Sequence, residues 1–312
     1  MKICVIGAGA MGSLFGALLY EAGHQVGLVA ARPAYMDAVR RNHGIVLEQG
    51  NNSRVVPCPL SLDAMDFANS DLCLVFVKST ATSHIASAAA ACLNEKGCIL
   101  TLQNGIGNAD ILAQHITPKR ILTGYTTHGA LLLEAGVVRH TGAGNTSLGP
   151  WQKGGLAEEL APQLAKVFTK AGITTQILDD ARAAIWDKLF VNIGINAIGA
   201  LLNITNGQVG QHPDSAALAS RAMEEAKKVA QAQGIKVRDD LFANFQSVCQ
   251  LTAQNRCSMW QDLQKKRLTE VDFIHGAISR MGAELGILTP INDVLASLVR
   301  IAQFYNLEGD EQ

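Results

Sequence analysis

The sequence lacks the features that define several classes of protein. Its 26 Lys and Arg residues nearly balance its 27 Asp and Glu residues, for a formal net charge of -1, so no overall basic excess points to nucleic acid. Since no run of about 18 uninterrupted apolar residues occurs, we expect no membrane span. The N-terminus has no apolar signal region followed by a cleavage site. What remains is a globular composition, with 48% hydrophobic and 17% charged residues in a chain of 312.

The cysteines are few and scattered. None of the seven belongs to a CxxC pair, and an odd, dispersed set indicates reduced thiols in a cytoplasmic protein rather than disulfides or a zinc site. Several, such as Cys4 and Cys73, lie inside apolar runs, where cysteine usually serves as a small core residue. We therefore expect no metal site.

The first half of the chain alternates short apolar runs with helical patterns. This alternation is typical of a parallel sheet with helices on both faces. A hairpin is expected within residues 44–58, and further strands within residues 120–149. The runs expected to form buried strands are Lys2–Ile6, Gln25–Ala30, Asp71–Val77 and Gly97–Leu102, with helices over residues 11–22 and 81–93.

The second half has few β-branched runs and many helical periodicities. We expect helices over residues 180–201, 213–233, 237–255, 257–285 and 288–305, with a breaker-rich stretch at residues 203–214. The predicted fold is an α/β N-terminal Rossmann-type domain, residues 1–179, followed by an all-α C-terminal domain, residues 180–312.

A glycine-rich turn joins the first strand to the first helix. Gly7-Ala8-Gly9-Ala10-Met11-Gly12 is a G-x-G-x-x-G motif. The first glycine makes the tight turn, the second lets a pyrophosphate approach the backbone, and the third permits close packing of helix on strand. Because the helix N-terminus offers free N–H groups, the context predicts a dinucleotide site rather than chance glycines in a loop.

The end of the second strand indicates which dinucleotide binds. An NAD site usually has an acidic residue there, bonded to the ribose 2′-OH, but this stretch reads Ala30-Ala31-Arg32-Pro33. Arg32 could bind a 2′-phosphate, which favours NADPH, or could be an ordinary solvated arginine.

Two further polar residues follow strands. Lys78 and Asn104 lie at predicted carboxyl ends of parallel strands, where ligands bind in open α/β sheets. Lys78 could pair with a phosphate or be an exposed strand-end lysine. Asn104 could present its amide to the cofactor or simply occupy a turn.

A polar stripe runs along an otherwise apolar helix. Lys188, Asn192 and Asn196 recur every four residues and therefore share one helix face. A buried network between helices would also explain asparagines, but a desolvated lysine favours a ligand with a carboxylate and a carbonyl.

A second set of polar residues follows on the predicted helix over residues 257–285. If that helix is continuous, Ser258 and Glu270 lie about 18 Å apart and hold different parts of the ligands. Asp262 is expected to face solvent or to pair with Lys265 or Lys266.

The order of these motifs resembles the ketopantoate reductase (2-dehydropantoate 2-reductase) family. The resemblance spans nearly the whole chain. It is carried by KICVIGAGAMG at the start, VKS at 77–79, QNGIG at 103–107, TTHGA at 126–130, WDKLFVNIGINAIGAL at 186–201, TNG at 205–207 and SMWQDLQKKRLTEVDFIHG at 258–276.

The resemblance implies NADPH-dependent reduction of 2-dehydropantoate to (R)-pantoate, in pantothenate and coenzyme A biosynthesis. It implies that Lys188 is the general acid. The implied substrate contacts are Asn104, Asn192, Asn196, Asn206 and Ser258. The implied cofactor contacts are Gly7, Ala8, Gly9, Ala10, Met11, Gly12, Arg32, Lys78, Asn104, Ala130 and Glu270.

Two other functions remain open at this point. One is reduction of another small 2-keto acid, and the other is a non-catalytic NADPH-binding sensor. A sensor would not need a proton donor on the polar stripe, so the stripe argues against it. The expected partner is a small 2-keto acid, without nucleic acid or membrane, and the protein is expected to be a monomer or a homodimer.

Overall fold

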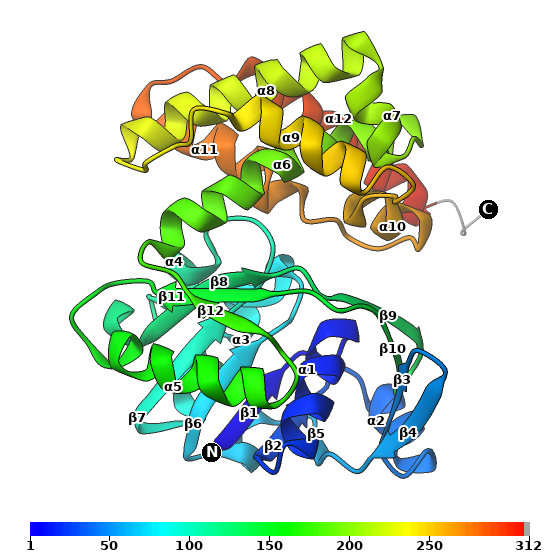
Figure 1. Ribbon diagram of the computed structural model, residues 1–312, viewed down its shortest axis with the longest axis vertical. Coiled ribbons are helices and arrows are strands. Elements are labelled where there is room, and N and C mark those ends of the chain that lie inside the picture. Colours follow the sequence, from blue (N-terminus) through cyan, green and yellow to red (C-terminus); the bar gives the residue numbers. More distant parts are fainter. Residues whose placement is uncertain (309–312) are drawn as a thin grey trace. The chain divides into compact units, whose positions relative to one another are not determined.

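The computed structural model describes residues 1–308 (Figure 1). The chain forms two compact units. The first comprises Met1–Gln103 and Asn108–Arg182, and the second comprises Asn104–Gly107 and the chain from Ala183 onward. The loop of residues 104–107 therefore packs with the helical unit, although it lies in the α/β half of the sequence.

The first unit is built on an eight-stranded sheet of order β12-β11-β8-β7-β6-β1-β2-β5. Neighbouring strands are parallel except for the antiparallel pair of β8 and β11. The strands are β1 (Lys2–Ile6), β2 (Gln25–Val29), β5 (Leu60–Ser61), β6 (Ser70–Val75), β7 (Leu93–Thr101), β8 (Ile121–Thr126), β11 (Thr146–Pro150) and β12 (Thr175–Ile177).

Both faces of the sheet are buried at its centre, which is why β1 and most of β2 and β6 are apolar. In β1, Ile3 and Val5 pack in one core layer while Cys4 and Ile6 pack in the other. The first layer is covered by α1 (Ala10–Glu21) and α5 (Leu156–Lys170), and the second by α3 (Thr82–Ala91) and α4 (Asn108–Leu112).

A second, four-stranded sheet of order β4-β3-β10-β9 completes the unit. The expected hairpin is present, since β3 and β4 pair antiparallel around Gly50, whose φ of 59° suits glycine. α1 packs against β9 and β10 as well as β2, so it lies between the two sheets. The elements are α2 (Pro33–Arg41), β3 (Ile45–Gln49), β4 (Asn52–Val56), β9 (Gly129–Glu134) and β10 (Val137–Gly142).

The second unit is helical, and its single core cluster surrounds the long helix α6. By length and composition α6 could cross a membrane, a test that core helices of soluble proteins also pass, and most of its apolar window is buried. The α-helices are α6 (Ala181–Leu202), α7 (Asn206–Gln211), α8 (Pro213–Ala232), α9 (Leu241–Leu251), α10 (Ser258–Gln264), α11 (His275–Leu285) and α12 (Pro290–Glu308). Short 3₁₀ turns are η1 (Ala64–Phe67), η2 (Ser79–Ala81), η3 (Pro118–Arg120) and η4 (Val271–Phe273).

The structure differs from the expected helices in two places: one predicted helix is broken, and one short helix was not predicted. The helix predicted over residues 257–285 is broken into α10, η4 and α11, because the chain turns at Lys266, whose φ is 49°. The separation of about 18 Å expected between Ser258 and Glu270 assumed a continuous helix and no longer applies. In the breaker-rich stretch, a capping box on Thr205 starts the short helix α7.

The fold also brings together cysteines that are scattered in the sequence. The sulfur atoms of Cys4, Cys73 and Cys92 lie within 4.8 Å of one another, and all three residues are buried. Cys4 and Cys73 are register partners on β1 and β6. Contacts with the sulfur atoms of Cys4 and Cys92, and then burial in this apolar layer, raise the pKa of Cys73 and keep its thiol protonated.

Candidate active site

The glycine turn of the first unit has the geometry that its motif requires. Gly7 has a φ of 109°, and a Cβ on it would lie 2.6 Å from the backbone nitrogen of Val77. A Cβ on Gly12 would lie 1.9 Å from the Gly7 carbonyl oxygen. Both positions therefore exclude any side chain, because the turn and the helix approach each other too closely.

Gly9, between them, differs because space is open beside it. A Cβ built there would meet no atom of the described residues within 4 Å. Gly9 is the N-cap of α1 and has no side chain to occupy the helix end, while Ala10 and Met11 begin the helix. The exposed N–H groups of a first helical turn suit an anion, so this turn fits the pyrophosphate of a dinucleotide.

The other predicted cofactor residues of this unit lie at strand ends or nearby. Arg32 is exposed and forms the N-cap of α2, three residues after the end of β2. Lys78 is exposed and begins η2, just after β6. Ala130 is half-buried in β9, where it pairs with His140. Ala8 donates its backbone N–H to the Val29 carbonyl, which ties the turn to β2.

A largely buried chain of hydrogen bonds supports these strand ends, and the sequence analysis missed it. The Gln103 side-chain nitrogen donates to the Val77 carbonyl and to the Thr82 hydroxyl, each at 2.9 Å. Thr82 donates to Asn108, which donates to Ser79. The only sequence signal was the QNG run, whose glutamine precedes the more conspicuous asparagine.

The second unit assembles a polar centre from three distant segments. The Lys188 ammonium group on α6 donates to the Asn104 side-chain oxygen at 2.9 Å, and the Asn104 side-chain nitrogen lies 3.4 Å from a Glu270 carboxylate oxygen. An asparagine thus joins a cation to an anion, each through the end of the amide with the complementary charge.

Glycine lets the Asn104 loop reach this centre. Gly105 has a φ of 81°, and a Cβ on it would lie 2.4 Å from the Phe273 carbonyl oxygen. That same oxygen accepts the Ile106 backbone N–H at 3.0 Å. The loop is therefore anchored on η4, immediately beside Glu270, and this contact positions Asn104.

Burial tunes the charge at this centre. Lys188 is only partly exposed, and desolvation lowers the pKa of its ammonium group to about 8, against the opposing attraction of Glu270. Glu270 itself is 6% exposed. A lysine with a pKa near neutrality can both hold and release a proton under physiological conditions.

The remaining predicted substrate residues surround the same helix. Asn192 is half-buried on α6, and Asn196 is buried one turn further on. The Cys257 thiol donates to the Asn196 carbonyl at 3.4 Å, and this contact brings the start of α10, with exposed Ser258, against α6. One residue differs from expectation: Asp262 is buried, not solvent-facing, because α10 turns it inward.

Asn206 lies at the start of α7, docked on the turn that follows α9. Its backbone N–H donates to the Asn255 carbonyl at 2.9 Å, and its side-chain nitrogen donates to the Thr252 hydroxyl, also at 2.9 Å. Gly207 permits the contact, since a Cβ on it would lie 2.8 Å from the Ala253 Cβ. Neither Thr252 nor Asn255 was found by sequence reasoning, because nothing local marks them.

Comparison with known proteins agrees with these features. Family models described as "Ketopantoate reductase PanE/ApbA" and its C-terminal counterpart match residues 3–153 and 180–303. A 2-dehydropantoate 2-reductase of Halobacterium salinarum is 35% identical over 303 residues, which cover 97% of this chain and 99% of that relative. The chain belongs to the ketopantoate reductase family. The predicted family and the predicted fold class are confirmed.

Solved structures of similar proteins extend over the same length. A PanE/ApbA family ketopantoate reductase from Ralstonia eutropha JMP134 has 32% identity and a TM-score of 0.89, covering 98% of this chain and 99% of its own. A D-mandelate dehydrogenase with NADH and anilino(oxo)acetate has 28% identity and a TM-score of 0.91, with the same coverage.

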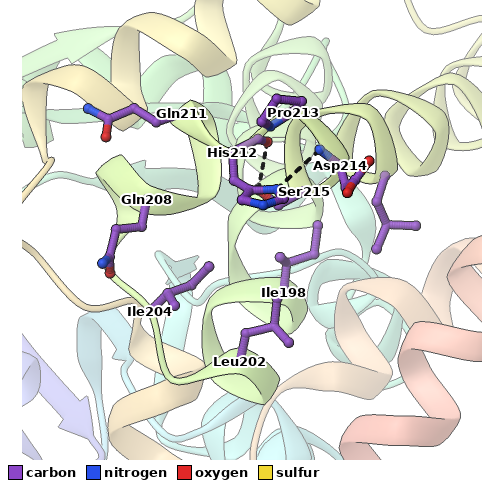
Figure 2. A pocket seen from close by; sticks show the side chains of 10 residues that line it. Ile198, Leu202, Ile204, Gln208, Gln211, His212, Pro213, Asp214 and Ser215 are labelled. Atoms are coloured by element: carbon purple, nitrogen blue, oxygen red, sulfur yellow. Dashed lines mark hydrogen bonds between the residues drawn. The ribbon is translucent and has the colours of Figure 1, made fainter.

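This member of the family also has an apolar cavity of about 630 Å³ in its second unit (Figure 2). His212 shapes its wall, since its ring accepts the Asp214 backbone N–H and its carbonyl accepts the Ser215 hydroxyl. None of the predicted site residues lines the cavity, so it is separate from the polar centre. The lining residues are Ile198, Leu202, Ile204, Gln208, Gln211, His212, Pro213, Asp214, Ser215 and Leu218.

Proposed function

We propose that this protein reduces 2-dehydropantoate to (R)-pantoate with NADPH, as a step toward pantothenate and coenzyme A. The observation that carries the proposal is the ammonium group of Lys188, which Asn104 holds and whose pKa burial lowers to about 8 against the attraction of Glu270. The names of the relatives agree with this reaction.

Cofactor binding is assigned to the glycine turn and its neighbours. The residues from Gly7 to Gly12 would hold the pyrophosphate, with Lys78, Ala130, Asn104 and Glu270 as further contacts. Arg32 would bind the 2′-phosphate, which is supported by its exposure after β2 and by the lack of an acidic residue at positions 30–33. When bound, NADPH supplies the hydride for the C2 ketone.

Lys188 acts as the general acid. As negative charge develops on the ketone oxygen, its ammonium group stabilises that charge and donates a proton from Nζ. Asn104 keeps the ammonium group oriented through its side-chain oxygen, and the Glu270 carboxylate favours the protonated form. The proton is then replaced from solvent, because Lys188 is partly exposed.

Four more residues would bind the rest of the substrate. Asn192 and Asn196 share the helix face of Lys188, so they are suited to hold polar groups next to the ketone. Ser258 and Asn206 would bind the carboxylate and a hydroxyl by hydrogen bonds from helix starts. No metal is assigned a role in this reaction.

The same reasoning assigns a cytoplasmic location and a small-molecule partner. All seven cysteines are free and buried, as suits a reducing compartment. We assign no partner among nucleic acids or membranes, and either a monomer or a homodimer accords with the proposal.

The runner-up function is reduction of a different 2-keto acid. It is favoured by the similarity to a D-mandelate dehydrogenase whose structure contains anilino(oxo)acetate and NADH. A non-catalytic dinucleotide sensor is the weaker alternative, because it gives no reason for a partly desolvated lysine on α6.

A substrate and cofactor panel separates these functions. The purified protein is mixed with 2-dehydropantoate, phenylglyoxylate or pyruvate and with NADPH or NADH, and nicotinamide absorbance is followed. The proposal expects the highest kcat/KM with 2-dehydropantoate and NADPH. A preference for phenylglyoxylate would support the runner-up, and cofactor binding without turnover of any keto acid would support the sensor.

A further inference from the structure

The Asn206 side chain has one polar atom whose partner is missing. Its oxygen, Oδ1, is shielded from solvent and accepts no hydrogen bond from any residue within 1–308. The residue as a whole is 9% exposed. A buried acceptor without a donor raises the free energy of the folded protein. We therefore expect Oδ1 to bind a donor that does not come from the described residues.

The direction in which Asn206 presents its amide follows from Thr252. The Thr252 hydroxyl has a single hydrogen, which it donates to the Val248 carbonyl at 2.7 Å. Toward Asn206 it can therefore only accept, so it must face the amide nitrogen, at 2.9 Å. The amide oxygen is left on the opposite side.

The backbone around this pair is held firmly. Thr252 ends α9 and also donates its backbone N–H to Val248. Asn206 and Gly207 donate their backbone N–H groups to the carbonyls of Asn255 and Ala253. Both main chains are therefore fixed. If the Asn206 amide rotated by half a turn, its nitrogen and Oδ1 would exchange places, and the hydrogen bond to the Thr252 hydroxyl would be lost.

We infer that Thr252 is a positioning residue that makes Asn206 present a hydrogen-bond acceptor and so selects 2-keto acids that carry a hydroxyl group. This inference rests on the proposed function. The carboxylate and ketone of any 2-keto acid are only acceptors, so they cannot satisfy Oδ1. The 4-hydroxyl group of 2-dehydropantoate can, whereas phenylglyoxylate has no such donor.

A matched pair of substrates tests the inference. 3,3-Dimethyl-2-oxobutanoate equals 2-dehydropantoate without its 4-hydroxyl group. For the unaltered protein with NADPH, we expect kcat/KM to favour the hydroxylated substrate by about 10²-fold or more, because an unpaired buried acceptor penalises the deoxy substrate.

Thr252→Val keeps the shape of the side chain and removes the hydroxyl. We expect it to lower the ratio of the two kcat/KM values about 10-fold or more, mainly through a higher KM for 2-dehydropantoate, because this contact exists before the reaction starts. Thr252→Ser restores the hydroxyl and should restore the ratio. Gln254→Ala, exposed in the same turn, serves as the control and should leave the ratio unchanged.

Each outcome bears on a different statement. An unchanged ratio in Thr252→Val, or a Thr252→Ser protein that behaves like Thr252→Val, overturns the role of Thr252 while the proposed function stands. If the Thr252→Val protein does not fold, Thr252→Ala is measured instead, because alanine removes the hydroxyl without adding any atom. If the unaltered protein reduces neither substrate, the proposed function fails and the inference fails with it.

Discussion

The glycine turn and the Lys188 centre reach their functions by opposite routes. The turn is local: six consecutive residues determine a tight backbone path, and the decisive groups are main-chain N–H groups. The Lys188 centre is assembled from residues 104, 188 and 270, and its decisive property is the environment of one side chain. A local site is sensitive to added atoms, whereas an assembled site is sensitive to lost partners.

The strongest test of this contrast removes the ammonium group itself. Lys188→Ala should lower kcat for ketone reduction by about 10²- to 10⁴-fold, as expected for loss of a general acid. Dinucleotide binding, measured by fluorescence titration, should change little because the glycine turn is intact. Lys228→Ala, on the exposed side of α8, is the matched control. Near-normal turnover in Lys188→Ala would remove Lys188 from the mechanism.

Adding one methyl group tests the local site. Gly9→Ala points into open space and should fold normally, yet raise KM for NADPH by about 10-fold or more because the methyl group occupies the place of the phosphates. Gly12→Ala should instead destabilise the fold by about 2 kcal/mol, since its Cβ meets the Gly7 carbonyl. Thermal denaturation and initial-rate kinetics measure both. Equal melting temperatures would contradict the contrast between these two positions.

A smaller effect is expected from Arg32, the residue assigned to the 2′-phosphate that distinguishes NADPH from NADH. Arg32→Ala should raise KM for NADPH about 10-fold and KM for NADH much less, because only NADPH carries the 2′-phosphate. Arg40→Ala, exposed on the same helix, is the control. Equal effects on the two cofactors would show that Arg32 does not read the phosphate.

The smallest expected effect concerns the electrostatic neighbour of Lys188. Reduction requires the protonated lysine, so its rate should fall as pH rises through about 8. Glu270 raises the pKa of Lys188, so Glu270→Gln should move this fall to lower pH. The profile of kcat/KM from pH 6 to 9.5 gives the midpoint, with saturating NADPH to offset any weaker cofactor binding. A midpoint that moves to higher pH would contradict the assigned attraction.

Sequence reasoning succeeded where a pattern reports a local constraint. The alternation of strands and helices, the hairpin at Gly50 and the long helix carrying Lys188 all appear as predicted. It failed at residues 257–285, where the periodicity suggested one helix. Three like charges at positions 265–267 and the left-handed backbone at Lys266 end α10 there, and periodicity does not register such a break.

The sequence by itself determined the dinucleotide turn and the apolar character of the central strands β1, β2 and β6, because positive φ angles and burial on both faces restrict the residue types there. It also placed a cation on the apolar helix α6. Only the tertiary structure decided which groups surround that cation, that Asn206 turns its oxygen away from Thr252, and that three scattered thiols meet. These depend on contacts between distant segments, which local patterns do not encode.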